Sequence, residues 1–584
     1  MSETRRVLVL DGDTPSALAV VRSLGRRGVR VDSGERRSID PNLSALSRFV
    51  AASFLYPDPL AEPDRFVLAI EERLRAAPYD LVIPITDDTL QPLAKARERL
   101  EPLAKLAIAP PAALEAMTDK EQTLALAVRL GLPVPVSETV ATPDEATALV
   151  ARLTFPVVLK PGRSIAAKTG EIRHKLNVRY AFTADEFATT MRDLLAAGPV
   201  LVQEYCRGEG VGIEVLCDRG EVVFAFQHKR LHEMPLTGGG SSYREAVPVD
   251  AKLLEYSRAL LGAVGWHGVA MVEWKHDPAT GRAALMEVNG RFWGSLPLAV
   301  AAGADFPWFL LELETRGVRP PVGTSYRVGV RARKLWMDAF WHIDVFRRSD
   351  PSPLIRWPSR WKTLASLFEM LLPRHRFDVQ STDDPRPGRL DLLRLRRAIT
   401  DRFLLRRWKR RTVERLERLR REPTELERRA RRAKSVLFLC YGNINRSALA
   451  EALLLRPGLA TPCAVASAGF HAVSGRPADP AMVGTAATNG LDLAASRSKT
   501  VDRDAIDRAD LVLAMDTANL ERLKAVYPEA LAKTILLGCY DDDLSLPVEI
   551  ADPYGGEPAA FEACYRRIAR AVARFRALRG GDAC

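Results

Sequence analysis

The chain is poor in cysteine and histidine for its length, with seven cysteines and eight histidines in 584 residues. The cysteines are odd in number and scattered, which excludes the dense disulfide framework of small secreted domains. This usage favours a reducing compartment, and we expect a cytoplasmic protein. Because 584 residues are too many for one hydrophobic core, we also expect two or three domains.

Long uncharged apolar runs are also missing. No stretch reaches the roughly 18 apolar residues that a membrane-spanning helix requires. The first apolar run, VLVL at residues 7–10, is short and has charged residues on both sides. We interpret it as a first β-strand and not as the apolar core of a secretion signal. Internal repeats and low-complexity tracts are absent as well.

The net charge of +12 comes from one segment of the chain. Residues 386–434 contain 20 Lys or Arg and 7 Asp or Glu, which accounts for the whole excess of positive charge. Within this segment the apolar residues recur at steps of three and four, as they do in a helix with one apolar face and an otherwise basic surface. These residues are Leu392, Leu395, Ile399 and Phe403.

Residues 331–434 are expected to form a basic helical connector between domains. The first part of the connector is rich in aromatic residues, namely Trp336, Phe340, Trp341, Phe346, Trp357 and Trp361. Three interpretations remain open. The helix packs on its own domains or is solvated, or it contacts an anionic membrane surface, for which Trp with Arg is suited. Nucleic-acid binding is the third and least favoured interpretation, because no recognised motif accompanies the charge.

Residues 1–330 alternate strand and helix patterns. Residues 5–13 predict a strand that ends in a polar turn, and residues 15–28 predict an amphipathic helix that ends at a glycine. Residues 79–88, YDLVIPITDD, indicate another buried strand. Such alternation is typical of parallel α/β structure.

From Thr118 onward the pattern becomes more specific. The segments that carry it are 118–140, 155–164, 200–216, 268–277 and 283–295. In order and spacing they resemble the ATP-grasp superfamily of carboxylate–amine ligases. The resemblance covers residues 1–315, and it implies a Rossmann-like domain over 1–117 followed by an ATP-grasp domain over 118–330.

The resemblance implies a site for ATP. Lys120 and Lys160 are expected to reach the phosphates. The hinge between a strand and a loop is expected to lie along the adenine, at Gln203, Glu204, Tyr205 and Cys206. The lid over the nucleotide is expected at residues 162–175, which contain Lys168 and few glycines.

A magnesium site is expected on two neighbouring strands of the same domain. Glu273 lies on one strand, and Glu287 and Asn289 lie on the next. Alternate residues of a strand face the same side, so Glu287 and Asn289 project together. Two carboxylates and an amide oxygen suit Mg²⁺ that bridges phosphates. Arg291 continues this face and is expected to hold the transferred phosphoryl group.

The superfamily chemistry would use a small carboxylate and an amine as substrates. The carboxylate attacks the γ-phosphate of ATP, and the amine then displaces phosphate from the acylphosphate. The alternative is a nucleotide sensor that ligates nothing and regulates the rest of the chain. The segment from Arg230 to Arg244 either closes over the acceptor substrate or forms a flexible surface loop.

The most informative residues are CYGNINRS at 440–447. An apolar strand-like run precedes them and a helix-like run follows, so the segment between forms a loop at a helix N-terminus. Backbone N–H groups in such a loop, together with the helix dipole, bind a phosphate group. A cysteine there is stabilised as the nucleophilic thiolate, and an arginine can grip two phosphoryl oxygens.

This segment resembles the low-molecular-weight protein tyrosine phosphatases, and the resemblance covers about residues 434–580. Further landmarks are SAGF at 467–470, GRPADP at 475–480, ADLVLAMD at 509–516 and ADPYGG at 551–556. The resemblance implies a phosphotyrosine protein substrate, a central parallel sheet and no cofactor. We therefore expect a phosphatase domain over residues 435–584.

The resemblance also implies a role for each residue of the site. Cys440 is the nucleophile that forms a phosphocysteine, and Arg446 binds phosphate and the transition state. Ser447 bonds the thiolate, and Asn443 stabilises the loop. Asp552 is the general acid that protonates the leaving oxygen.

Two residues depart from the family pattern. Asn445 stands where the family often has a second cysteine, and Ala448 stands where it often has proline. Neither change touches a catalytic atom. Ile444 favours phosphotyrosine, whereas the related arginine-phosphate phosphatases tend to have threonine at that position. An arsenate reductase is disfavoured, because it needs extra cysteines in a mobile segment after the nucleophile. A buried structural thiol is the simplest alternative for Cys440.

Overall fold

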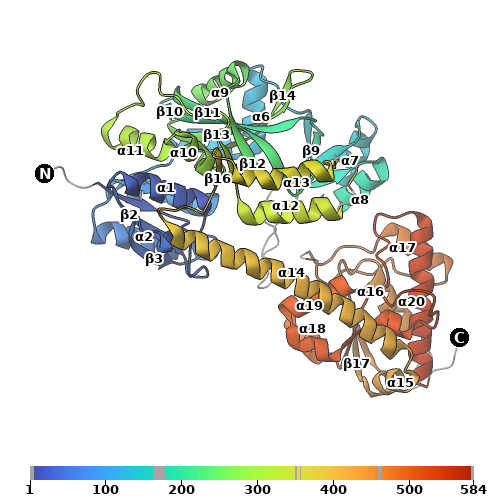
Figure 1. The fold of residues 1–584 in the computed structure, drawn as a ribbon. Coiled ribbons are helices and arrows are strands. Elements are labelled where there is room, and N and C mark those ends of the chain that lie inside the picture. The colour runs from blue at the N-terminus through green and yellow to red at the C-terminus, as the bar shows by residue number, and fades with distance from the viewer. Residues whose placement is uncertain are drawn as a thin grey trace. The chain divides into compact units, whose positions relative to one another are not determined.

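The computed structural model describes residues 5–161, 178–195, 198–348, 352–355, 357–457, 462–471 and 473–580 (Figure 1). The chain forms two compact units. The first unit consists of Met1–Pro135 with Cys206–Ile399, and the second consists of Val136–Tyr205 with Thr400–Cys584. Each unit has its own buried apolar clusters.

The first unit begins with a five-stranded sheet in the order β3-β2-β1-β4-β5. Every neighbouring pair is parallel. The strands are β1 (Arg6–Val9), β2 (Arg30–Arg36), β3 (Val50–Tyr56), β4 (Leu81–Ile83) and β5 (Lys105–Leu106). The helices of this part are α1 (Pro15–Arg26), α2 (Pro63–Ala76), α3 (Asp87–Lys95), α4 (Arg97–Leu100), α5 (Pro111–Thr118) and α6 (Lys120–Arg129). The predicted parallel α/β pattern is confirmed here.

A seven-stranded sheet forms the rest of the first unit, in the order β14-β13-β10-β11-β12-β15-β16. Its strands are β10 (Glu209–Asp218), β11 (Glu221–Met234), β12 (Gly240–Val247), β13 (Gly268–Asp277), β14 (Arg282–Asn289), β15 (Arg331–Arg333) and β16 (His375–Phe377). Its helices include α9 (Ala251–Ala263), α10 (Leu296–Ala302) and α11 (Phe306–Arg316).

The prediction of parallel strands is wrong for this second sheet. All its neighbouring strands are antiparallel except β15 and β16. Only residues 219–220 separate β10 from β11, and only 278–281 separate β13 from β14. Such connections are too short for the crossover that parallel neighbours require, so they form hairpins.

The first part of the expected connector completes this sheet. Strands β15 and β16 are its last two members, and between them lie α12 (Leu335–Arg347), α13 (Arg360–Phe368) and the 3₁₀ helix η2 (Glu369–Leu371). The Asp378 carboxylate accepts two hydrogen bonds of 2.6 Å from the Arg244 guanidinium on β12, and both side chains are fully buried. Residues 331–378 are therefore integral to the first unit.

The second unit contains a four-stranded antiparallel sheet in the order β6-β9-β7-β8. Its strands are β6 (Ser137–Val140), β7 (Val157–Pro161), β8 (Arg179–Ala181) and β9 (Val200–Glu204). Helices α7 (Pro143–Val150) and α8 (Ala184–Leu195) pack on it through Leu149, Phe187 and Met191. We call residues 136–205 the small domain.

The other part of the second unit is a parallel sheet in the order β18-β17-β19-β20. Its strands are β17 (Ser435–Cys440), β18 (Ala464–Gly469), β19 (Leu511–Ala514) and β20 (Thr534–Leu536). Its helices are α16 (Arg446–Leu454), α17 (Pro480–Thr488), α18 (Arg503–Arg508), α19 (Thr517–Val526) and α20 (Pro558–Leu578). Helices α16 and α20 lie side by side (Figure 1). The expected central parallel sheet is confirmed.

The basic segment is helical, as predicted. Helix α14 runs over Pro385–Arg420 and α15 over Pro423–Arg432. The predicted apolar face around Ile399 and Phe403 is exposed rather than packed. Further along, Leu416 and Leu426 are buried in the core of the parallel-sheet part of the second unit.

Among the described residues, no single helix has the length and apolar composition needed to cross a membrane. Helices α10 and α11 meet these criteria only when they are taken together, and they are bent by 91° relative to each other.

Candidate active sites

The loop between β17 and α16 forms a small bowl around the Cys440 thiol. Cys440 ends the strand and Arg446 begins the helix, so both side chains are fixed at the carboxyl edge of the sheet. The Asn443 backbone N–H donates to the Cys440 Sγ at 3.1 Å, and the Ser447 Oγ lies 3.0 Å from the same sulfur. The sulfur is buried and is contacted by groups that stabilise a thiolate.

Asn443 holds the loop in shape. Its φ of 53° lies in the left-handed region, which asparagine tolerates better than most residues. Its side-chain amide donates to the Ser447 Oγ at 2.9 Å and to the Ser467 Oγ at 2.8 Å. Its Oδ1 accepts the Lys499 backbone N–H at 2.7 Å. The structure thus brings Asn443 and Ser447 together beside the Cys440 sulfur.

The Arg446 guanidinium lies between two carboxylates. It donates through Nη1 to Asp516 at 2.5 Å and to the Ile550 carbonyl at 3.0 Å, and through Nη2 to Asp552. Burial alone would lower the pKa of Arg446, but the charges of Asp552, Cys440 and Asp516 raise it above its usual range. The predicted general acid therefore lies at the mouth of the bowl, in contact with the predicted phosphate ligand.

A pocket of about 220 Å³ opens onto this bowl. Its lining includes Cys440, Asn445, Asp552 and Tyr554. The Asn445 side chain is buried, and neither of its amide atoms has a hydrogen-bond partner among the described residues. The sequence showed that Asn445 departs from the family pattern. It did not predict that the Asn445 amide would lack a hydrogen-bond partner among the described residues.

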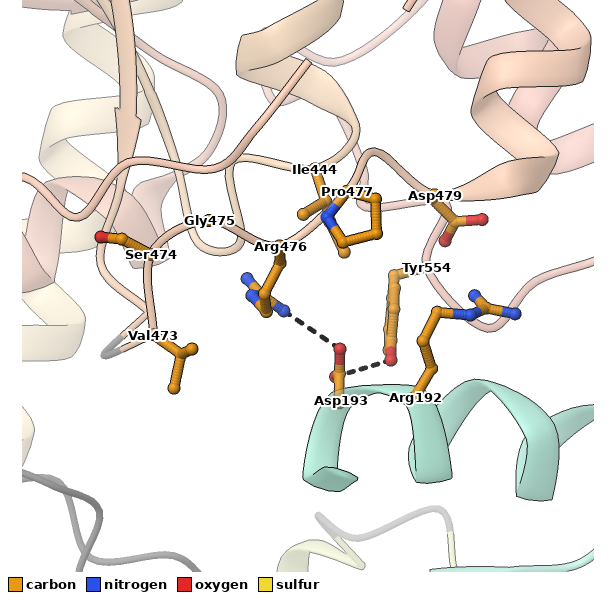
Figure 2. Close-up of a pocket in the computed structure, with 10 residues that line it drawn as sticks. All are labelled: Arg192, Asp193, Ile444, Val473, Ser474, Gly475, Arg476, Pro477, Asp479 and Tyr554. Carbon is orange, nitrogen blue, oxygen red and sulfur yellow. Dashed lines mark hydrogen bonds and ion pairs between the residues drawn. The ribbon is translucent and has the colours of Figure 1, made fainter. Parts of the chain in front are cut away.

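The small domain supplies another wall of this pocket, through Arg179 and Asp193. Figure 2 shows Asp193 on α8 pointing at Arg476 and Tyr554. The Asp193 carboxylate accepts from the Arg476 Nη1 at 3.0 Å, from the Tyr554 Oη at 2.6 Å and from the Arg179 Nη1 at 3.2 Å. Arg476 also donates to the Gly442 carbonyl of the bowl at 2.6 Å. An adjoining pocket of about 240 Å³ has Arg192 and Asp193 on one side.

The predicted magnesium ligands of the first unit lie together. Glu273 on β13 is opposite Glu287 on β14. The Asn289 Nδ2 lies 3.2 Å from the Glu287 Oε1 and 3.5 Å from the Glu273 Oε1. Burial raises the pKa of Glu273, the Arg230 charge lowers it, and the Glu287 charge raises it again. The Glu273 and Glu287 carboxylates repel each other at this site. A divalent cation bound by both would relieve the repulsion.

Arg230 and Arg244, at the two ends of the segment expected to close over an acceptor or form a loop, lie in strands. They are paired residues on β11 and β12, and both side chains are largely buried. Arg230 donates to the Glu273 carboxylate at 2.6 Å, beside the candidate metal ligands. The sequence placed Arg230 near an acceptor carboxylate but did not predict this ion pair with Glu273.

Two further predicted ATP ligands, Lys120 and Arg291, belong to the first unit. Lys120 is exposed on the first turn of α6. Arg291 donates to the Asp87 carboxylate at 3.0 Å through Nε and at 2.8 Å through Nη2. This bidentate pair ties Arg291 to the start of α3, so the guanidinium is not free for a phosphoryl group unless the pair opens.

In the small domain, the Lys160 Nζ donates to the Gln203 Oε1 at 2.7 Å, across β7 and β9. Glu204 ends β9, and its backbone N–H donates to the Val136 carbonyl at 2.9 Å. Tyr205 and Cys206 follow, and the boundary between the two units falls between these two residues. The predicted hinge therefore lies where the chain passes from one unit to the other. The lid segment with Lys168 lies outside the described residues.

A buried cluster of His232, Asp338 and His342 was not predicted. Its ligand atoms lie within 4.8 Å of one another, as in a metal site. However, the Arg333 guanidinium binds Asp338, and the His342 Nε2 lies 2.9 Å from the Ser366 Oγ. These contacts make the cluster a hydrogen-bonded network that anchors α12 and α13.

Comparison with known proteins finds relatives for both parts of the chain. A family model described as low molecular weight phosphotyrosine protein phosphatase matches residues 435–578. The probable low molecular weight protein-tyrosine-phosphatase EpsP of Ralstonia nicotianae is 37% identical over 151 residues, which are 25% of this chain and 98% of that protein. The low molecular weight protein-tyrosine-phosphatase Wzb of Escherichia coli (strain K12) is 34% identical over 143 residues, 24% of this chain and 92% of that protein.

A second family model, described as ATP-grasp in the biosynthetic pathway with Ter operon, matches residues 197–334. Among solved structures, the L-amino acid ligase from Bacillus licheniformis has a TM-score of 0.43 and 18% identity, over 54% of this chain and 75% of that one. The ADP complex of N5-carboxyaminoimidazole ribonucleotide synthetase has a TM-score of 0.46 and 15% identity, over 59% and 85%. Residues 197–334 thus match an ATP-grasp family model, and through residues 435–578 the chain belongs to the low molecular weight protein-tyrosine-phosphatase family.

Proposed function

We propose that the second unit hydrolyses phosphotyrosine in proteins through a phosphocysteine intermediate. The observation that carries this proposal is the set of contacts around one sulfur. The Cys440 Sγ lies 3.0 Å from the Ser447 Oγ, in a bowl whose arginine contacts the carboxylate of Asp552. A thiolate nucleophile needs a reducing environment, which agrees with a cytoplasmic location.

The reaction has two displacements. In the first, the Cys440 thiolate attacks phosphorus, the bond from phosphorus to the tyrosine oxygen breaks, and Asp552 gives its proton to that oxygen. In the second, Asp552 takes a proton from water, the water oxygen attacks phosphorus, and the S–P bond breaks to release inorganic phosphate. Arg446 turns its Nη2 from Asp552 to the phosphoryl oxygens and stabilises their charge.

Substitution of the two chemical groups tests this proposal. We expect Cys440→Ser to reduce phosphatase turnover to background, because a serine hydroxyl is not ionised at neutral pH. Asp552→Asn should lower kcat on a phosphotyrosyl peptide by about 10²–10⁴-fold, as loss of a general acid does. Full activity of Cys440→Ser on an aryl phosphate would refute the mechanism.

For the ATP-grasp domain we propose ATP- and Mg²⁺-dependent ligation of a small carboxylate to an amine. The convergence of Glu273, Glu287 and Asn289 supports it, since these oxygen donors suit Mg²⁺. The metal ion, when bound, would neutralise charge on the phosphates. Arg230, which already pairs with Glu273, would keep this carboxylate oriented. The Lys160 ammonium would contribute a positive charge toward the phosphates.

ADP release in the presence of pooled carboxylic acids and amines tests for ligation. We expect release to depend on both substrate classes and to be lost in Glu287→Gln. Asp277→Asn is the matched control, because it changes a half-buried carboxylate at the far end of β13, away from Glu273. ATP binding without any ADP release would reject ligation.

A second candidate function is control of the phosphatase by the ATP-grasp domain. It is favoured by Asp193, which belongs to the small domain and contacts Arg476 and Tyr554 at the mouth of the phosphatase pocket. Tyr205, next to the expected adenine site, belongs to the same unit as α8, so we infer that nucleotide binding would act on the phosphatase through α8. In this account the small domain restricts access to Cys440.

Asp193→Asn tests this control in the full-length protein. We expect kcat/KM on a phosphotyrosyl peptide to rise several-fold, with little change on p-nitrophenyl phosphate, because the small substrate needs less room. Asp185→Asn, on the first turn of the same helix, is the control. Equal effects of the two variants, or none from either, would remove the support for control through this contact.

A further inference from the structure

Helix α13 buries its polar side and exposes its apolar side, which is the reverse of an ordinary surface helix. Its buried side chains are Thr363 and Ser366, whereas Trp361 and Phe368 are 80% and 66% exposed. The exposed apolar residues continue through η2, where Leu371 is 82% exposed. We define the α13 patch as Trp361, Leu364, Phe368, Leu371 and Leu372.

The inversion is fixed by polar contacts on the buried side. The Ser366 carbonyl accepts a hydrogen bond of 2.6 Å from the buried Arg333, and the Ser366 Oγ lies 2.9 Å from the His342 Nε2. The Thr363 Oγ1 donates to the Ser359 carbonyl at 3.1 Å. Rotating α13 to bury its apolar side would leave Arg333 and His342 without these partners, so the patch cannot turn inward cheaply.

The α13 patch is flanked by positive charge. Arg360, Lys362 and Arg374 are exposed beside it. The one acidic residue of this stretch, Glu369, is engaged by Arg331 at 2.9 Å and by the Tyr243 hydroxyl at 2.5 Å. Burial raises the pKa of Glu369, but these hydrogen bonds and the Arg331 charge lower it overall, so the carboxylate is ionised and neutralised by its partner.

Exposed apolar residues flanked by Arg and Lys bear on whether the α13 patch binds a protein or a lipid bilayer. The centres of protein–protein interfaces are depleted in lysine, although arginine is enriched there. Helices that lie in a bilayer interface instead combine Trp, Phe and Leu on one face with Lys and Arg beside it. Exposed apolar patches of this kind mark an interaction surface, and the flanking cations are complementary to anionic lipid headgroups.

We propose that the α13 patch binds the surface of an anionic lipid bilayer. Trp361, Phe368 and Leu371 enter the boundary between headgroups and acyl chains, and Arg360 and Lys362 contact the headgroups. The helix has only nine residues, so it lies in the interface and does not span the membrane. This proposal is independent of the phosphatase and ligase chemistry.

Vesicle sedimentation of the full-length protein tests it. The vesicles contain either phosphatidylcholine alone or phosphatidylcholine with phosphatidylserine. We expect binding to the anionic vesicles that weakens with salt, and a loss of at least about tenfold in the double variant Trp361→Ser, Phe368→Ser. The matched control is Leu68→Ser with Val318→Ser, two exposed apolar residues (47% and 48%) outside the patch.

A second variant separates headgroup contact from apolar insertion. Arg360→Gln with Lys362→Gln should weaken binding to the anionic vesicles alone. Activity on p-nitrophenyl phosphate, expected to be unchanged in all variants, shows that the second unit has folded, and urea unfolding followed by tryptophan fluorescence checks the first unit. Wild-type protein that stays in the supernatant with anionic vesicles at low salt overturns the proposal. Binding of the patch variant to anionic vesicles at the level of the control variant also overturns it. A patch variant that changes only self-association, measured by sedimentation velocity, overturns it as well and would identify a protein interface.

Discussion

The contacts of single residues hold the Cys440 bowl in shape. Asn443 uses its backbone N–H on the sulfur and its side chain on Ser447, Ser467 and Lys499. One residue therefore links the nucleophile, the helix and the neighbouring strand. Because each contact is preformed, phosphate binding requires little rearrangement of the loop.

His471 lies beside this bowl, and we predict that it does not titrate in the physiological range. Burial, together with the Arg476 charge, lowers the pKa of His471 to about 4. In the unfolded chain the imidazole takes up its proton near pH 6.5. Between pH 6.5 and about 4 the unfolded state therefore binds more protons, and the stability of the second unit falls as the pH falls.

An NMR titration of the histidine Cε1–H signals checks this prediction. The signal assigned to His471, by its loss in His471→Gln, should stay constant from pH 8 to 5. The pH profile of phosphatase kcat/KM should keep its shape in that variant over the same range. A midpoint near 6.5 for this signal would contradict the buried, neutral imidazole.

At the scale of elements, β16 and the residues after it hold the seven-stranded sheet together. The Arg244 and Asp378 side chains are 1% and 0% exposed, so this ion pair is screened from water. We predict that Asp378→Ala destabilises the first unit by about 3–5 kcal/mol, because it leaves a buried guanidinium without its partner.

Asp383→Ala is the control for Asp378→Ala. The Asp383 and Arg26 side chains pair at 2.8 Å but are 43% and 40% exposed, so its loss should cost at most about 1 kcal/mol. Urea unfolding followed by tryptophan fluorescence is the measurement, since eight of the nine tryptophans belong to the first unit. If both variants lose the same free energy of unfolding, burial does not determine how strongly the Arg244–Asp378 pair stabilises the first unit.

Local patterns in the sequence predicted most of the elements and the phosphatase bowl. Cys440, Asn443, Arg446 and Ser447 lie within eight residues, so the geometry of one strand, loop and helix brings them together. The hairpins of the seven-stranded sheet were missed, because alternation of strands and helices does not reveal which neighbours pair. The Arg230–Glu273 pair joins residues 43 positions apart on strands whose pairing the sequence does not encode locally.

The boundaries of the connector were equally hard to predict from composition. The tryptophan-rich part was assigned to the connector because it matches the motifs of neither domain. In the structure, only three residues of β15 and three of β16 join the sheet. The exposed α13 patch could be noticed as aromatic density, but its inversion follows from the Ser366 contacts, which are visible only in three dimensions.

At the scale of the whole molecule, the chain passes between its two units three times. The crossings are at residues 135/136, 205/206 and 399/400. The small domain of the ATP-grasp part therefore groups with the phosphatase, and Asp193 supplies a specific contact between them.

The contacts of α14 and α15 with the phosphatase core predict which fragment of the chain folds stably by itself. The Arg420 side chain is fully buried and donates to the carbonyls of Asp541, Leu546 and Asp543. Leu416 and Leu426 belong to the same core. We predict that a fragment of residues 400–584 unfolds cooperatively, whereas 435–584 is less stable by at least about 2–5 kcal/mol, the value for one buried leucine. Thermal unfolding of the two fragments compares them, and equal midpoints would refute a structural role for α14 and α15.

The most direct test of the account is to find the covalent intermediate. Full-length Asp552→Asn is mixed with an aryl phosphate, quenched in acid within milliseconds, digested and analysed by mass spectrometry. We predict one phosphoryl group on the peptide that contains Cys440, because the variant cannot activate water to release it, and none in Cys440→Ser. A phosphoryl group on any other residue, or rapid turnover with no phosphorylated cysteine in the wild-type protein, would contradict it.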